Sequence, residues 1–244
     1  MQPRPISAWD HSWDISPEEA RRLQKELARE VSQTDGFREL GTIAGLDLGY
    51  PRTSTGDEIG RAAVVVLRYP GLEPVEERVA LQPVSFPYVP GLLSFREAPV
   101  GLAALASLET SPDLIVVDGH GRAHPRRFGI ACHLGVLLDR PTIGCAKSIL
   151  VGHADEPGPV PGDWTPLVHR DEVIGAVLRT RVNVKPVYVS VGHKVSLETA
   201  IATIVACLRG YRLPEPTRLA DRLASQRGVP PEARIVPADA IIGP

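Results

Sequence analysis

The feature that most constrains this chain is the apolar run Leu114-Ile115-Val116-Val117, which ends abruptly at Asp118, Gly119 and Gly121. Four consecutive apolar residues predict a short strand that is buried on both faces, as is typical of parallel strands covered by helices. In such sheets ligands gather at the carboxyl ends of the strands. Glycines at that point allow the backbone to approach a ligand closely. The run therefore predicts an α/β domain with a functional group at Asp118.

The segment after this strand predicts a β-α-β unit. Residues 127–139 have the apolar spacing of a helix, and residues 141–148 form a second short strand. Since β-α-β crossovers are right-handed, the two strands are expected to be parallel. Lys147, near the end of the second strand, should then lie at the same end of the sheet as Asp118.

Two further carboxylates are expected near Asp118. Residues 42–49, 61–69 and 75–84 predict an antiparallel meander, and Asp47 lies in the first of these strands. A helix is expected to start at Pro99, because proline is favoured in a first helical turn, and this leaves Glu97 just ahead of it. Carboxylates gathered in one place repel one another unless a hard cation binds them, so Asp47, Glu97 and Asp118 predict a site for Mg²⁺ or Mn²⁺. Lys147 and His193 are the expected active-site partners.

Two segments beside these acids suggest contacts with nucleic acid. Pro87 and Pro90 stiffen a loop with Tyr88 and Val89 at its tip, which suits a wedge between stacked bases or, alternatively, a loop packed on the core. The basic cluster Arg122, His124, Arg126 and Arg127 lies close to Asp118 in the sequence. Such a cluster suits phosphate binding, although basic runs are often solvated surface.

The composition is that of an ordinary globular protein. The 244 residues carry a net charge of −2 and contain no apolar run long enough to cross a membrane. We expect one domain over residues 1–244, with a core at about 17–225 and an extended tail at about 228–244. The three cysteines, Cys132, Cys145 and Cys207, lie in apolar segments, which predicts reduced core residues and a cytoplasmic protein. A monomer is expected.

The order of the motifs resembles the endonuclease V family. The segments that carry the resemblance are Pro87 to Gly91, Leu93 to Glu97, Val117 to Gly121, His124 to Arg126, Gly129 to His133, Gly144 to Lys147 and Ser190 to His193. The resemblance implies a ribonuclease-H-like fold and Mg²⁺-dependent nicking of DNA at the second phosphodiester bond 3′ to deoxyinosine, as a step in the repair of deaminated bases. It implies a catalytic group of Asp47, Glu97, Asp118, Lys147 and His193. It also implies a strand-separating wedge of Pro87, Tyr88, Val89 and Pro90, and a lesion pocket of Gly91, Leu93, Gly119 and Gly121.

Other functions are compatible with parts of the sequence. An inosine-specific endoribonuclease would differ only in contacts to a 2′-hydroxyl. A reader of damaged nucleic acid would keep the fold but lose an acid, and all three acids are present. A sugar-kinase-like phosphotransferase is suggested by Leu46 to Gly49 followed by Thr53 to Gly56, but that class needs two such domains, and the chain has no repeat.

Overall fold

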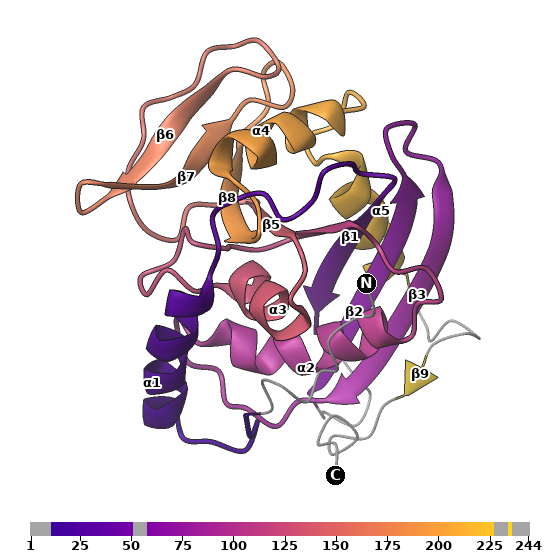
Figure 1. Ribbon diagram of the computed structural model, residues 1–244, viewed down its shortest axis with the longest axis vertical. Helices are drawn as coiled ribbons and strands as arrows, with labels where there is room; N and C mark the ends of the chain where they lie inside the picture. The colour runs from indigo at the N-terminus through magenta and orange to yellow at the C-terminus, as the bar shows by residue number, and fades with distance from the viewer. Residues whose placement is uncertain (1–10, 51–57, 227–233, 236–244) are drawn as a thin grey trace.

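The computed structural model describes residues 11–50, 58–226 and 234–235. The strands in these ranges form one mixed sheet in the order β6-β7-β8-β5-β4-β1-β2-β3-β9, with β6 at one edge and β9 at the other (Figure 1). Their bounds are β1 Thr42–Gly49, β2 Ile59–Arg68, β3 Pro74–Pro83, β4 Leu114–Val117, β5 Thr142–Ala146, β6 Trp164–His169, β7 Glu172–Leu178, β8 Val187–His193 and β9 Arg234–Ile235.

Strand pairing confirms the ribonuclease-H-like sheet that the sequence predicts. The strands β1, β2 and β3 form the antiparallel meander. The strand β4 pairs in parallel with β1 on one side and with β5 on the other, so the β-α-β prediction is also confirmed. The carboxyl ends of β1, β4 and β5 therefore meet at one edge of the sheet.

Helices cover both faces of this sheet. Their bounds are α1 Pro17–Leu27, α2 Leu93–Ala106, α3 Ile130–Leu138, α4 Leu197–Ala206 and α5 Glu215–Ala224, with a short 3₁₀ helix, η2, at Ala28–Glu30. The β4 residues Leu114 and Val116 pack in the core that contains α4 and α5, whereas Ile115 and Val117 pack in the core that contains α2 and α3. Burial on both faces explains why the strand is apolar at every position.

A glycine allows α5 to lie directly on β1. A Cβ atom at Gly45 would be 2.0 Å from the backbone oxygen of Pro216, which is far inside van der Waals contact. Any side chain at Gly45 would therefore push the start of α5 away from the sheet. This close approach fixes where the rest of α5 lies along β1.

Two predicted helix starts were wrong. The helix α2 begins at Leu93 and contains Pro99, because the packing of the buried residues Leu92, Phe95 and Ala98 outweighs the hydrogen bond that proline cannot make. The helix α3 begins at Ile130, with Gly129 as its N-cap, rather than at Arg127. The preceding residues form an irregular loop, in which Arg127 has a positive φ of 59°.

Several other expectations concern the ends and the cysteines. At the N-terminal side of the core, α1 begins with a capping box formed by Ser16 and Glu19. The expected tail falls mostly on residues 227–233 and 236–244, outside the described ranges, while Arg234–Ile235 pairs with β3. The three cysteines are free and buried. Within the described ranges, no helix has the length and apolar character needed to span a membrane.

Candidate active site

Three aspartates meet at the edge of the sheet where β1 and β4 end. Carboxylate oxygens of Asp47, Asp118 and Asp221 all lie within 4.8 Å of one another. The register of the parallel pair places Leu46 opposite Val117, and the Asp118 backbone N–H donates to the Leu46 carbonyl at 2.8 Å. Asp47 and Asp118 are thus adjacent because of strand pairing, and α5 adds Asp221.

Lys147 lies among these acids. Its Nζ is 2.5 Å from Asp118 Oδ2 and 2.5 Å from Asp221 Oδ1. Burial by itself would lower the pKa of Lys147, but hydrogen bonds to the two aspartates raise it well above its usual value. The side chain is therefore a permanent cation at this site. Its position beside Asp118 is the one that the predicted parallel pairing of β4 and β5 requires.

The acids are arranged so that they favour a further positive charge. Burial, followed by the hydrogen bond and charge of Asp118, raises the pKa of Asp47 to about 8. Burial and then the charges of Asp47 and Asp118 raise the pKa of Glu97 to about 8. Buried carboxylates of this kind are stabilised in the ionised form by a hard cation with oxygen ligands. The donor set of Asp47, Asp118 and Asp221 therefore fits a divalent metal ion.

Glu97 lies beside this group but is not part of it. Its oxygens fall outside the cluster of three aspartates, although their charges affect its pKa. The residue lies in α2 and, with Asp118, lines a neighbouring cavity. The structure thus brings Glu97 to the site, and its role as a metal ligand stays a prediction.

The cavity next to the acids has a volume of about 310 Å³. Its walls come from three loops and the starts of α2 and α3: Tyr88, Val89, Pro90, Gly91, Leu93, Ser94, Glu97, Asp118, Gly119, His120, His124, Gly129, Ile130, Ser148, Ile149 and Leu150. This volume is at the lower end of the range for small-ligand sites. Tyr88 stands at the rim with 71% of its surface exposed, while Val89 packs against a small core that contains Phe86. The structure thus places the aromatic tip of this loop beside the cavity, and its role as a wedge stays a prediction.

Two predicted site residues lie elsewhere. His193 pairs with Thr142 at the beginning of β5, whereas Lys147 follows the end of β5, because β8 runs antiparallel to it. Its Nδ1 accepts a hydrogen bond from the Ser32 backbone N–H at 3.2 Å. Gly121 is buried behind the cavity wall, where a Cβ atom would be 2.1 Å from the Val191 oxygen. Neither residue lines the cavity, and their predicted roles in the site stay predictions.

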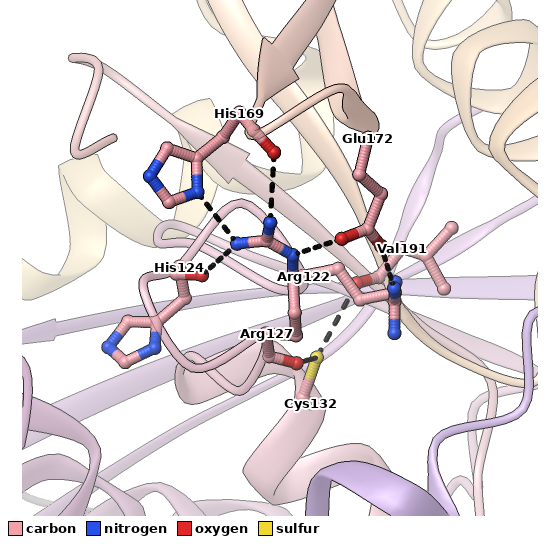
Figure 2. A network of polar contacts seen from close by, with 7 residues as sticks. All are labelled: Arg122, His124, Arg127, Cys132, His169, Glu172 and Val191. Atoms are coloured by element: carbon pink, nitrogen blue, oxygen red, sulfur yellow. Dashed lines mark hydrogen bonds and ion pairs between the residues drawn. The ribbon is translucent and has the colours of Figure 1, made fainter. Parts of the chain in front are cut away.

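The predicted basic cluster is bound by the protein itself. Figure 2 shows Arg122 and Arg127 converging on one carboxylate, that of Glu172 at the start of β7. The distances are 2.5 Å from Arg122 and 2.7 Å from Arg127. Arg127 also donates to the carbonyl oxygens of His124 and His169. These contacts attach the loop between β4 and α3 to the β6–β7 hairpin, and DNA contact by Arg122, His124 and Arg126 stays a prediction.

Sequence reasoning missed Asp221 and His120. Asp221 flanks the buried stripe of an amphipathic helix, where an acid looks like ordinary solvated surface. His120 lies between two motif glycines, Gly119 and Gly121, and the sequence pattern assigned it no role. In the structure its Nδ1 is buried at the cavity wall without a hydrogen-bond partner among the described residues. Only the packing of α5 on Gly45 and the path of the loop reveal these two positions.

The acids lie at the carboxyl ends of central strands, beside a cavity with an exposed aromatic rim. This arrangement is that of a nuclease whose acids could hold a metal ion. The sequence model of Endonuclease V matches residues 25–222. Endonuclease V of Roseiflexus castenholzii is 58% identical over 91% of this chain and 97% of its own. The chain belongs to the endonuclease V family.

Solved structures agree with this assignment. The crystal structure of Endonuclease V from Streptomyces avermitilis is 46% identical and has a TM-score of 0.82, covering 87% of this chain and 93% of that one. Endonuclease V of Ciona intestinalis, in complex with a 24mer DNA containing an inosine followed by a ribo-adenosine, is 30% identical with a TM-score of 0.73. It covers 85% of this chain and 95% of its own.

Proposed function

We propose that this chain is a DNA-repair endonuclease that binds deaminated purines and hydrolyses the second phosphodiester bond 3′ to deoxyinosine, leaving a 3′-hydroxyl and a 5′-phosphate. The observation that carries the proposal is the adjacency of the aspartate group to the cavity, because Asp118 belongs to both. A base extruded into the cavity would hold its own strand against the acids. The Ciona relative, crystallised with inosine-containing DNA, supports the substrate class.

The proposed metal is Mg²⁺, with Mn²⁺ as a substitute, held by Asp47, Asp118 and Asp221 with Glu97 beside them. A bound Mg²⁺ would supply Lewis-acid stabilisation of the phosphate and an activated water. Lys147 would bring a fixed positive charge to the scissile phosphate, because its two aspartate contacts keep it protonated. The ionised acids would hold and orient the attacking water.

The wedge and the pocket would divide the work of recognition. Tyr88, flanked by Pro87, Val89 and Pro90, would separate the strands, which costs a few kcal/mol per step of stacking. Hypoxanthine pairs more weakly than adenine, so it is extruded at lower cost. Gly91, Leu93 and Gly119 would then enclose it in the cavity. We propose that the protein acts as a monomer.

A nicking assay tests the proposal. A labelled duplex with one deoxyinosine is incubated with Mg²⁺, with Mg²⁺ and chelator, and with the Asp118→Ala protein, and the product is mapped to one nucleotide. We expect a metal-dependent nick at the second 3′ bond, which is absent in the variant and on undamaged DNA. Binding without cleavage by the wild-type protein would instead indicate a reader of damaged nucleic acid.

RNA is the second candidate substrate. The ribo-adenosine that follows inosine in the DNA bound to the Ciona relative motivates a direct comparison. The assay is therefore repeated on matched DNA, RNA and single-ribonucleotide strands. We expect cleavage of the all-DNA strand, and a strict requirement for a 2′-hydroxyl would assign the protein as an inosine-specific endoribonuclease.

A further inference from the structure

Gln24 on α1 connects the two loops that border the cavity, which we call its lips: the loop that carries Tyr88 and Gly91, and the loop from Gly119 to Phe128. Its side chain is fully buried. Its Nε2 donates to the Gly91 carbonyl at 3.2 Å and to the Phe128 carbonyl at 2.7 Å, and its Oε1 accepts from Arg126 Nε. Gly91 belongs to the lip that carries Tyr88, and Phe128 ends the lip that begins at Gly119. One amide group therefore joins two segments that are far apart in the sequence.

Three side chains converge on the Gly91 carbonyl. Besides Gln24, Arg126 donates to it through Nη2 at 2.6 Å and His124 through Nε2 at 3.1 Å. His124 Nδ1 accepts from the Arg126 backbone N–H at 3.2 Å, which fixes the neutral tautomer with its proton on Nε2. The carbonyl thus has more donors than its two lone pairs accommodate ideally, and its position is strongly determined.

The backbone at Gly91 makes this arrangement possible. Its φ is +78°, and a Cβ atom there would lie 2.7 Å from Arg126 Nη2. A glycine is therefore needed both for the turn and for the approach of the guanidinium. Gly91 joins the wedge loop to the first turn of α2, so the anchored carbonyl also sets the placement of Leu93 and Glu97.

We propose that Gln24 is a positioning residue that sets the separation of the two lips and thereby holds the extruded base, and the phosphate linked to it, in register with the aspartates. Gln24 does not line the cavity, so it acts through Gly91, Arg126 and Phe128. This inference rests on the proposed nicking of inosine-containing strands. Its own prediction is that loss of Gln24 slows the chemical step more than it weakens binding.

Two variants separate the contacts. Gln24→Met keeps the length of the side chain and removes all three hydrogen bonds. Gln24→Glu keeps the acceptor for Arg126 and removes the donors to Gly91 and Phe128. Asp113→Asn is the matched control, because Asp113 Oδ2 accepts from the Gly41 and Thr42 backbone N–H groups at 2.9 Å each, at the opposite end of the sheet.

Single-turnover nicking of a single-stranded deoxyinosine oligonucleotide gives the maximal rate and the half-saturating enzyme concentration separately, and thermal melting reports stability. We expect both Gln24 variants to lose about 10- to 100-fold in maximal rate, the scale of an ångström-sized misplacement, with half-saturation nearly unchanged. Asp113→Asn should lower the melting temperature and leave the maximal rate intact. Because both side chains hold one carbonyl, Gln24→Met combined with Arg126→Met should lose less than the product of the single losses.

A wild-type maximal rate in either Gln24 variant would overturn the inference. It would also be overturned if Asp113→Asn, at the same melting temperature as a Gln24 variant, lost the same fraction of the maximal rate. A third contrary result would be a double variant whose loss in maximal rate equals the product of the two single losses. In all these outcomes the wild-type protein nicks the strand, and the proposed function stands. Absence of nicking by the wild-type protein would refute the proposed function and the inference together.

Discussion

Lys147 Nζ donates to Asp221 Oδ1 over 2.5 Å, although 74 positions separate the two residues. The contact joins the end of β5 to α5, so the acidic group is complete only when α5, which follows these strands in the sequence, is packed on β1. Docking depends on the absence of a side chain at Gly45. The packing of one helix is thus linked directly to the composition of the site.

Asp221→Asn is expected to impair cleavage by weakening metal binding. The substitution keeps the size of the side chain but removes the charge of one of the three carboxylates. Lys147 keeps its contact with Asp118. We expect the Mg²⁺ concentration for half-maximal nicking to rise at least about 10-fold. Glu198→Gln on α4 is the control, since it removes a helix acid away from the site. An unchanged Mg²⁺ dependence would exclude Asp221 as a ligand.

Gly45→Ala should disturb the site through α5. The added methyl would overlap the Pro216 backbone, so we expect a loss of about 1–3 kcal/mol in the free energy of unfolding, measured by urea denaturation. Nicking should fall further than this instability explains, because Asp221 moves with the helix. Gly49→Ala lies on the same strand and meets nothing within 4 Å, so it should have the wild-type stability and rate. Equal behaviour of the two variants would contradict the role of close packing.

Local sequence patterns were sufficient for the central sheet. The run from Leu114 to Val117 is apolar throughout because it packs against a helix layer on each face. Chain direction and crossover handedness then place Lys147 near Asp118, as found. Asp47 was found because an acid inside a strand needs a partner.

The features that sequence reasoning missed depend on contacts between distant segments. Asp221 reaches the acids only because α5 packs closely on Gly45. His193 was misplaced because its proximity to Lys147 depends on the direction of β8, which a short apolar run does not encode. The start of α2 before Pro99 is a case in which burial of Phe95 outweighs a local rule.

Tyr88→Ala should affect double-stranded substrates more than single strands. Tyr88 is 71% exposed at the rim of the cavity, so its removal costs the fold little. Loss of the aromatic tip should lower kcat/KM on a deoxyinosine duplex about 10- to 100-fold, which corresponds to a few kcal/mol of strand separation. Activity on the same strand without its complement should change much less. Equal losses on both substrates would argue against a wedge.

His120→Leu should weaken recognition of the base. His120 lines the cavity, and its Nδ1 is buried without a partner among the described residues, so we expect the ring to turn and bring this atom to the edge of a bound purine. Removing that bond is expected to lower kcat/KM for a deoxyinosine strand about 5- to 150-fold, from about 1–3 kcal/mol for a lost buried hydrogen bond. The control is His153→Leu, an exposed histidine that does not line the cavity. A wild-type rate in the His120 variant would show that the base is read without this side chain.

His124 should make the protein less stable in mild acid. Burial, and then the positive charge of Arg126, lowers the pKa of His124 from 6.5 to about 3. Between these values the unfolded chain binds a proton that the folded chain does not, so the contribution of His124 to folding stability falls as the pH drops below 6.5. From pH 7 to pH 5 the expected loss is about 2 kcal/mol.

Urea denaturation of the wild-type protein and His124→Gln at pH 7 and pH 5 isolates this contribution, because the other titrating groups are common to both proteins. The variant should have a lower stability at pH 7, since glutamine cannot accept from the Arg126 backbone and donate to Gly91 in the same geometry. It should nevertheless lose less stability than the wild-type protein between the two pH values. An equal loss in both would mean that His124 is protonated in the folded protein at pH 5, and its Nδ1 could then no longer accept the hydrogen bond that fixes its tautomer.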